Sequence, residues 1–126
     1  MDENYVSYAE GVIKKLIVKD RNGNEKINLT TSKIRNILSM VSDLYNDTQR
    51  FRNERLSDDL YMRTQYLKMR MAYESGRDDA VKDFIEKADL INKIDKIGRS
   101  KEKLLNFCHY MEALVAYPKF YGGKEN

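Results

Sequence analysis

The stretch that decides the fold reads LLNFCHYMEALVAY and runs from Leu104 to Tyr117. Helical spacing places its large apolar side chains on one stripe, formed by Leu104, Phe107, Cys108, Met111 and Val115. Its other side carries His109, Ala113, Ala116 and Tyr117, and Glu112 is the charged residue of the run. A helix that is apolar nearly all round is buried on both sides. We therefore predict that one side packs on the core and that another element or a second subunit covers the other.

The same spacing of apolar residues continues upstream and predicts four more helices, so we expect an all-α fold. Their expected ranges are 4–18, 30–50, 57–76 and 78–98, and the last helix starts at 100 and is stopped or kinked by Pro118. Capping side chains mark the starts: a hydroxyl among residues 30–32, then Ser57, Asp78 and Ser100. Short joints predict a compact bundle of about five helices, a single domain over residues 1–126.

Residues 20–28 are polar and contain Asn22 and Gly23, a dipeptide that often turns a β-hairpin. The apolar runs on either side, 17–18 and 27–29, are short, and a lone two-stranded hairpin is marginally stable in water. We therefore favour a loop over a hairpin for this segment.

The chain carries 23 Lys and Arg against 20 Asp and Glu, a formal net charge of +3. This modest charge is compatible with a nucleic-acid partner and also with an ordinary soluble protein. The sequence has no apolar run long enough to span a membrane, and its N-terminus lacks the pattern of a signal peptide. A lone cysteine, Cys108, cannot form an intrachain disulfide, which suits the reducing cytoplasm where we expect the protein.

The residue patterns of known catalytic and metal sites are missing from the sequence. The single His and single Cys are neighbours, and adjacent helical positions point about 100° apart, so they cannot share a metal ion. The acidic pairs Asp58–Asp59 and Asp78–Asp79 stand at helix starts, where capping accounts for them. We therefore expect a protein that is not an enzyme, has no catalytic residue and needs no metal or cofactor.

Basic side chains on the second helix suit contact with an RNA backbone. A helical wheel places Arg35, Ser39, Ser42, Asn46 and Arg50 on one flank, and Lys33 stands near the helix N-terminus. Arginine offers forked, charged hydrogen bonds to phosphate, and Ser and Asn offer neutral ones. A solvated helix face has the same pattern, and the sequence leaves that alternative open.

The segment after this helix gathers Arg50, Arg52 and Arg55 around Phe51. Arginines beside an aromatic ring suit single-stranded RNA, through phosphate contacts and base stacking. A helix end that buries Phe51 and leaves the arginines in water fits equally well. Further basic residues downstream extend the candidate RNA-binding patch, namely Arg63, Arg70 and Arg77.

Acids precede bases by four residues in three pairs on the fourth helix: Asp78–Lys82, Asp83–Lys87 and Asp89–Lys93. We expect these ion pairs to neutralise most of the basic residues of this helix, which makes them poor RNA contacts. The remaining candidate surface is for assembly with other subunits. It combines small and aromatic residues at the end of the chain: Ala113, Ala116, Tyr117, Lys119, Phe120 and Tyr121.

Three segments resemble, in the same order, the small helical subunit of the type III-A CRISPR effector, the Csm complex. They read LTTSKIRN at 29–36, GRDDAVKDFIEKA at 76–88, and FCHYMEALVAY at 107–117 followed by KFYGGK at 119–124. The resemblance thus extends from residue 29 to the end of the chain. Because Lys82 lies inside the second segment, we add it to the candidate RNA contacts in spite of its expected partner Asp78.

The resemblance implies a non-catalytic subunit whose copies stack into a short filament along a channel that holds guide and target RNA. The implied partners are copies of itself, the other subunits of the Csm complex and the guide–target RNA duplex, mainly its target strand. Target cleavage is implied to belong to backbone subunits, and DNA cleavage and cyclic oligoadenylate synthesis to the large subunit. The alternative is a helical protein–protein adaptor or dimer without RNA contact, which would not need so many arginines on one surface.

Overall fold

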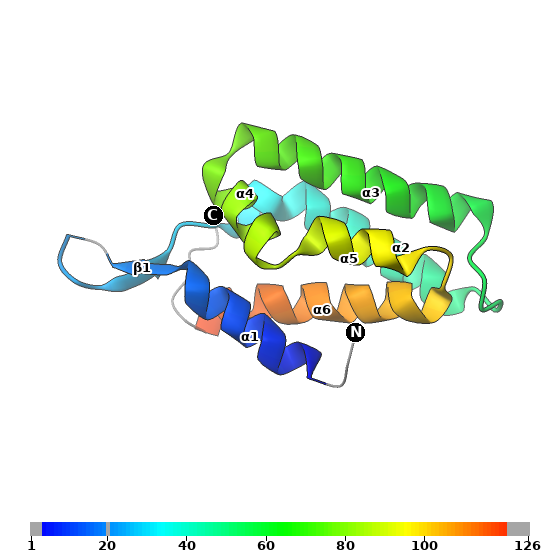
Figure 1. Cartoon of the computed structure of the whole chain (residues 1–126), viewed down its shortest axis with the longest axis horizontal. Helices are drawn as coiled ribbons and strands as arrows, with labels where there is room; N and C mark the ends of the chain where they lie inside the picture. Colours follow the sequence, from blue (N-terminus) through cyan, green and yellow to red (C-terminus); the bar gives the residue numbers. More distant parts are fainter. Residues whose placement is uncertain (1–3, 20, 121–126) are drawn as a thin grey trace.

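The computed structural model describes residues 4–19 and 21–120, with the side chains of Thr31 and of residues 117–120 left aside. Its elements, in chain order, are α1 (Tyr5–Leu16), β1 (Ile17–Lys19), β2 (Glu25–Ile27), the 3₁₀ helix η1 (Thr31–Ile34), α2 (Arg35–Arg50), α3 (Asp58–Arg77), α4 (Asp79–Lys87), α5 (Leu90–Ile97) and α6 (Lys101–Phe120). The predicted all-α bundle is confirmed, with one short hairpin added to it (Figure 1).

Helix α6 lies in the middle of the bundle, with α1 on one side and α2 and α5 on the other (Figure 1). Four residues of its predicted stripe are buried, namely Leu104, Phe107, Cys108 and Met111, whereas Val115 is half-buried. Tyr110 and Leu114 are fully buried as well, although they lie outside the predicted stripe. The α6 helix is thus buried on two sides, and α1 of the same chain supplies part of the second cover.

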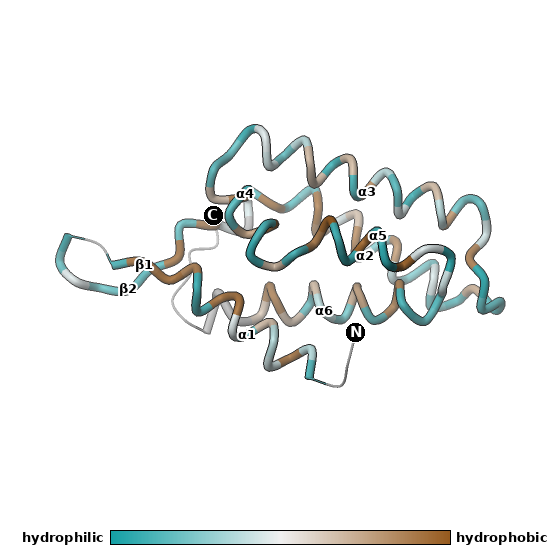
Figure 2. Tube along the Cα trace, in the orientation of Figure 1, coloured by the Kyte–Doolittle hydropathy of each residue, from teal (hydrophilic) through white to brown (hydrophobic). Residues whose placement is uncertain are grey.

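The segment predicted as a loop forms an antiparallel hairpin, so that prediction was wrong. Ile17 of β1 pairs with Ile27 of β2, and Gly23 adopts the left-handed φ of +81° that a tight turn requires. The hairpin is stable because it is not isolated: Ile27 is only 3% exposed and packs on the core. Figure 2 shows its hydrophobic end against the bundle and its hydrophilic end projecting away from it.

The predicted helix over residues 78–98 is broken into α4 and α5, which was not expected. Asp89 stands at the break with φ of +57°, a conformation that Asp tolerates better than most residues. The break rotates the following turn, so that Leu90 is fully buried and Ile91 only half-buried. The carbonyl of Ala88 is bound at 3.0 Å by the hydroxyl of Tyr110, which ties the break to the central helix.

Most predicted helix caps are present. Asp78 accepts hydrogen bonds from the backbone N–H groups of Ala80 and Val81, and Ser57 and Ser100 each cap the first turn of the helix that follows them. The hydroxyl cap expected for α2 is wrong: η1 precedes that helix, and Thr30 makes no side-chain capping bond. The 3₁₀ helix η1 runs directly into α2, which therefore begins at Arg35 and not near residue 30. A hydroxyl at residues 30–32 is too far upstream to cap the first turn of α2.

The C-terminal boundary contradicts one of the two outcomes expected at Pro118, that it stops the last helix. Helix α6 continues to Phe120, two residues beyond Pro118, so this proline does not stop it. Pro118 removes its own backbone donor, and only two residues of α6 follow it. The expected end of the third helix at Gly76 agrees with the structure to within one residue, since α3 ends at Arg77.

The central position of α6 predicts an unequal effect of two adjacent substitutions. Replacing Met111, which is 1% exposed, with Ala removes buried methylene groups and leaves a cavity, and we expect a loss of about 2–5 kcal/mol of unfolding free energy. The control is Glu112→Ala at the next, exposed position, which should change stability by less than about 0.5 kcal/mol. Urea unfolding followed by circular dichroism measures both. Equal stabilities of the two variants would contradict the central burial of α6.

Candidate nucleic-acid interface

The predicted basic residues lie at two ends of the bundle, joined by the exposed flank of α2. Arg50, Arg52, Arg55 and Arg63 surround the α2–α3 connection, whereas Lys33, Arg35, Arg77 and Lys82 surround the α3–α4 joint (Figure 1). Helix α3 has 20 residues and is therefore about 30 Å long, which sets the separation of the two ends. The predicted flank of α2 is exposed along its length, from Arg35 through Ser39, Ser42 and Asn46 to Arg50.

Asp47 holds two of the predicted arginines at the α2–α3 end. Its carboxylate accepts hydrogen bonds from Arg63 at 2.8 Å and from Arg50 at 2.9 Å. The hydrogen bond from Arg63, and then that from Arg50, lowers the pKa of Asp47 below its ordinary value of 3.8. Asp47 was not among the predicted residues, although it precedes Arg50 by three residues, about one helical turn. Arg63 also lies 3.6 Å from Asp59, so the two arginines are balanced by two acids and offer little net positive charge to a phosphate chain.

Arg52 and Arg55 are different, because both are exposed and neither forms an ion pair with any described residue. The segment that carries them is nevertheless firmly held. The backbone N–H of Leu56 donates to the carbonyl of Arg99 at 2.8 Å, and the N–H of Lys101 donates to the carbonyl of Glu54 at 2.9 Å. These bonds fasten the α2–α3 connection to the α5–α6 connection. Two uncompensated guanidinium groups therefore project from an ordered segment of backbone.

Phe51 packs half-buried against the core, so it is not free to stack on a base. Its carbonyl also accepts a short hydrogen bond from the ammonium group of Lys101. Of the two readings that the sequence left open for this segment, the burial of Phe51 favours the one without base stacking. The arginines around it remain available for phosphate groups.

Asp78 organises the other end of the bundle. It caps α4 and forms an ion pair with Lys33 at 3.4 Å, rather than with Lys82 as predicted. Burial opposes ionisation of this carboxyl, but hydrogen bonds from Val81 and Ala80 and the charge of Lys33 together lower its pKa. The predicted Asp78–Lys82 pair is wrong because Asp78 points to its own helix N-terminus. Lys82 and Arg35 are exposed and form no ion pair within the described part of the chain.

The other two predicted pairs of this region have different outcomes. The Asp83–Lys87 pair is present at 2.5 Å. The Asp89–Lys93 pair is absent among the described contacts, because Asp89 has left the helical conformation. The ammonium group of Lys93 lies instead over the rings of Tyr8 and Tyr110, at 4.7 and 5.3 Å from their centroids.

Glu74 binds the remaining two predicted arginines. This carboxylate is 8% exposed and lies 3.6 Å from Arg70 and 3.5 Å from Arg77. Both guanidinium groups also lie over the ring of Tyr73. Glu74 thus neutralises part of the positive charge of these two arginines. The spacings of four and three residues along α3 are the sequence signal that could have indicated these two pairs.

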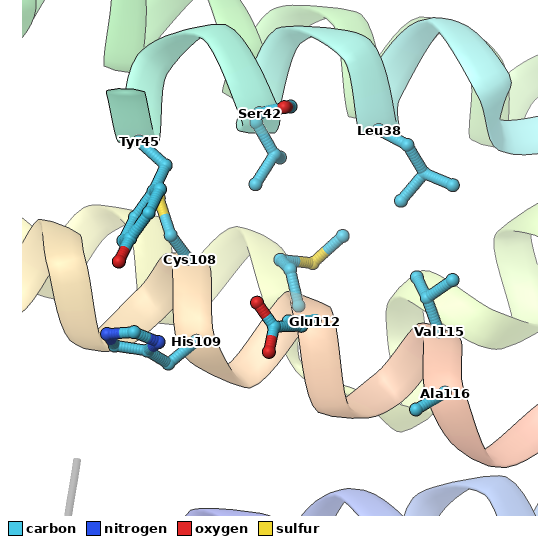
Figure 3. A pocket seen from close by; sticks show the side chains of 10 residues that line it. Leu38, Ser42, Tyr45, Cys108, His109, Glu112, Val115 and Ala116 are labelled. Atoms are coloured by element: carbon cyan, nitrogen blue, oxygen red, sulfur yellow. The ribbon is translucent and has the colours of Figure 1, made fainter. Parts of the chain in front are cut away.

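A groove of about 370 Å³ opens between α2 and α6, next to the predicted assembly surface (Figure 3). Its walls are mainly apolar, and its lining residues are Leu38, Val41, Ser42, Tyr45, Cys108, His109, Met111, Glu112, Val115 and Ala116. Burial raises the pKa of the Cys108 thiol to about 12, so the thiol stays protonated and unreactive at neutral pH. The imidazole of His109 lies between the rings of Tyr5 and Tyr45.

The structure describes the side chains of only two of the predicted assembly residues, Ala113 and Ala116. Ala116 is exposed at the groove, whereas Ala113 is half-buried and packs against the core. The side chains of Tyr117, Lys119 and Phe120, and the whole of Tyr121, lie outside the described residues. The groove was not predicted, because Leu38 and Tyr45 belong to α2, which is far from α6 along the chain.

The described residues also bear on metal binding and on membrane insertion. They contain no group of three or more His, Cys, Asp or Glu side chains arranged to hold a metal ion. No helix among them is both long and apolar enough to cross a membrane.

Comparisons with known proteins add a relationship over nearly the whole chain. A family described as Csm2 Type III-A matches residues 11–124. A protein named "CRISPR system Cms protein Csm2" from Streptococcus thermophilus is 48% identical over 124 residues, which are 98% of this chain and 96% of the relative. A protein of the same name from Mycobacterium tuberculosis H37Rv is 42% identical over 125 residues, 99% and 97% of the two chains.

The contacts of Asp47 predict a dependence of stability on pH. Its pKa is lowered in the folded state, so its bonds to Arg63 and Arg50 stabilise the protein at pH values above 3.8 and are lost as the pH falls through the folded pKa. We expect Asp47→Asn to lower the melting temperature at neutral pH and the difference from wild type to shrink on acidification. Asp43→Asn, on the same helix but without an ion pair among the described residues, is the control. If the difference in melting temperature between Asp47→Asn and wild type grows as the pH falls, the pKa of Asp47 is not lowered by folding.

Proposed function

Because the chain belongs to the Csm2 family, the small subunit of type III-A CRISPR complexes, we propose that it lines the RNA channel of such a complex and contacts the RNA backbone. The observation that carries the proposal is the pair Arg52 and Arg55, which are exposed, uncompensated and held on an ordered segment. Their partner is the guide–target RNA duplex, mainly the target strand. The other subunits of the Csm complex are partners through family membership.

The charge balance divides the predicted RNA contacts into two groups. Lys33, Arg63, Arg70 and Arg77 are bound to acids of the same chain, and Arg50 shares Asp47 with Arg63. The free cations among the candidates are Arg35, Lys82, Arg52 and Arg55. We assign the direct phosphate contacts to these four. The cations that are paired with acids hold neighbouring parts of the chain together, and we assign them no direct phosphate contact.

The arrangement of the free cations suits a phosphate chain that runs along α2. Arg35 begins this helix, Arg52 and Arg55 follow its end, and the 16 residues of α2 span about 24 Å. The exposed Ser39 and Asn46 offer neutral hydrogen bonds along the way. Since Phe51 is packed on the core, no aromatic ring of this segment reads a base. Recognition of this kind follows the backbone and leaves the choice of sequence to base pairing.

Assembly requires a second surface, and we assign it to the end of α6 and to the groove between α2 and α6. Copies of the subunit stack into a short filament through residues that include Ala113, Ala116, Tyr117, Lys119, Phe120 and Tyr121. The apolar walls of the groove, formed by Leu38, Val41 and Val115 among others, suit an apolar side chain of a neighbouring subunit. A stack in which each copy contacts the next head to tail extends without closing.

We assign no chemistry to this subunit, and no cofactor. Residues 1–126 act as one domain in the cytoplasm, and target cleavage belongs to other subunits of the complex. The runner-up is a protein–protein adaptor that makes no RNA contact. The apolar groove favours it, and the arginine experiment below separates the two functions.

The RNA contact predicts an effect that depends on where charge is removed. Replacing both Arg52 and Arg55 with Ala should weaken target-RNA binding by the assembled complex about tenfold or more, because two charged contacts to phosphate are lost. The control Lys96→Ala with Lys103→Ala removes the same charge at exposed positions of α5 and α6 and should have a small effect. Filter binding at several salt concentrations should also give a shallower salt dependence for the arginine variant alone. Unchanged binding in a complete complex would support the adaptor.

The assembly surface predicts different outcomes for two alanines three residues apart. Ala116 is exposed, so Ala116→Glu should keep the melting temperature of the free subunit and prevent its copurification with the complex. Ala113 is half-buried against the core, so Ala113→Glu should lower the melting temperature, because a carboxylate loses hydration there. Normal copurification of a folded Ala116→Glu variant would show that this surface takes no part in assembly. Scanning fluorimetry and affinity purification provide the two readouts.

A further inference from the structure

The net positive charge of the chain is concentrated around the hairpin. Residues 14–27 hold five Lys and Arg against two Asp and Glu, a formal net charge of +3. The whole chain also carries +3, so the remaining residues are balanced, with 18 basic against 18 acidic side chains. The five cations are Lys14, Lys15, Lys19, Arg21 and Lys26. We call residues 14–27, the end of α1 together with the hairpin, the basic arm.

Most cations of the basic arm have no acidic partner. Lys14 lies 3.9 Å from Glu10. The other four are exposed and form no ion pair with any described residue. The strand register places Lys19 opposite Glu25, but these two form no ion pair within the described part of the chain either. The arm therefore offers ammonium and guanidinium groups that no carboxylate of the described residues neutralises.

The basic arm is fixed at its base and extends into solvent at its turn. Ile17 pairs with Ile27, and Ile27 is buried in the core. Lys26, the neighbour of Ile27 on β2, points to the opposite face, because side chains alternate along a strand. Figure 2 shows the hydrophilic part of the hairpin projecting from the bundle. Because the strand pair is ordered, a partner that binds these cations orders little further backbone.

The basic arm lies at the end of the bundle where α2 begins (Figure 1). Eight residues separate Lys26 from Arg35, the first residue of α2. Two of them, Leu29 and Ile34, are buried in the core and hold this connection against the bundle. A phosphate chain that follows α2 from Arg55 to Arg35 therefore reaches the arm next. The arm extends that path beyond the length of about 24 Å that α2 provides.

We propose that the basic arm is a second RNA contact, which binds backbone phosphates beyond the end of the subunit's own α2. This inference rests on the proposed function and adds Lys19, Arg21 and Lys26 to the four cations assigned there. A protein surface is a poorer partner, because the core of a protein interface is apolar. Val18 is the one large apolar side chain exposed on the described part of the arm. A contact of this kind binds phosphate and reads no base.

Removal of two charges tests the contact in the assembled complex. The arm variant combines Arg21→Ala with Lys26→Ala and keeps Lys19, because Lys19 lies opposite Glu25. We expect binding of a complementary target RNA to weaken about tenfold, since two phosphate contacts are lost. Each such contact contributes about 0.7–0.9 to the slope of log affinity against log salt concentration, so the slope should become less steep by about 1.5–2.

Two further variants make this measurement specific. Lys96→Ala with Lys103→Ala removes the same charge at exposed positions of α5 and α6 and should leave affinity and slope nearly unchanged. Arg21→Lys with Lys26→Arg keeps the charge of the arm and should bind as wild type does, because phosphate accepts hydrogen bonds from either cation. Circular dichroism and copurification check that each variant folds and assembles.

Photo-cross-linking identifies the partner while all charges of the arm are intact. Val18 lies opposite Lys26 in the strand register and is exposed. Val18→Cys labelled with a benzophenone maleimide should therefore cross-link to the target RNA in the assembled complex. Lys96→Cys with the same label should not. Wild type, whose Cys108 is only 5% exposed, checks that labelling is confined to the introduced cysteine.

The contrary results separate the arm from the α2 contact. An assembled arm variant with the affinity and salt slope of wild type overturns the arm contact, and replacement of Arg52 and Arg55 then tests the proposed function by itself. Equal losses in the arm variant and in the Lys96 and Lys103 variant also overturn it, because total charge would then explain both. Cross-links from residue 18 to a protein subunit in place of RNA make the arm a protein contact. If the arm variant fails to assemble, the cross-linking result decides.

Discussion

The burial of α6 sets the positions of the other helices. This helix has apolar side chains over most of its circumference, so α1, α2 and α5 must approach it from different sides to remove them from water. The hairpin follows from the same requirement, because it adds Ile27 to the core beside α1. The face of α3 that points outward is the one that this arrangement leaves uncovered. Both the exposed apolar side chains of α3, Met62, Tyr66, Met69 and Tyr73, and the groove beside α6 are thus consequences of how the central helix is covered.

One hydrogen bond links the central helix to the irregular part of the fold. The hydroxyl of Tyr110 is buried and binds the carbonyl of Ala88, which the break between α4 and α5 leaves outside regular helical bonding. A buried hydroxyl and a buried carbonyl would each be costly without a partner. The pair therefore makes the break compatible with a packed interior. Burial raises the pKa of Tyr110, which keeps this hydroxyl protonated as a donor.

Acidic residues decide which of the many cations are available to a partner. Asp47 and Asp78 each bind a basic side chain from another element, and Glu74 binds two arginines of its own helix. Among the candidate RNA contacts, the cations without an acidic partner in the described part of the chain are Arg35, Lys82, Arg52 and Arg55. Separated cations of this kind suit a contact that tracks a backbone within an assembly, since the assembly supplies the remaining affinity.

The sequence by itself determined the helical class, the central role of residues 104–117 and the caps at Ser57, Asp78 and Ser100. These features depend on local periodicity and on side chains close to their own backbone partners, and both can be read along the chain. The family could also be recognised from the order of three segments.

Only the tertiary structure decided the hairpin, the break at Asp89 and the division of the basic residues into bound and free. Each of these depends on a contact with a distant element: Ile27 on the core, Tyr110 on Ala88, Arg63 on Asp47 and Lys33 on Asp78. The sequence shows that an arginine is present, but its available charge depends on which acid lies near it. That distance is set by the packing of helices, which joins residues far apart along the chain.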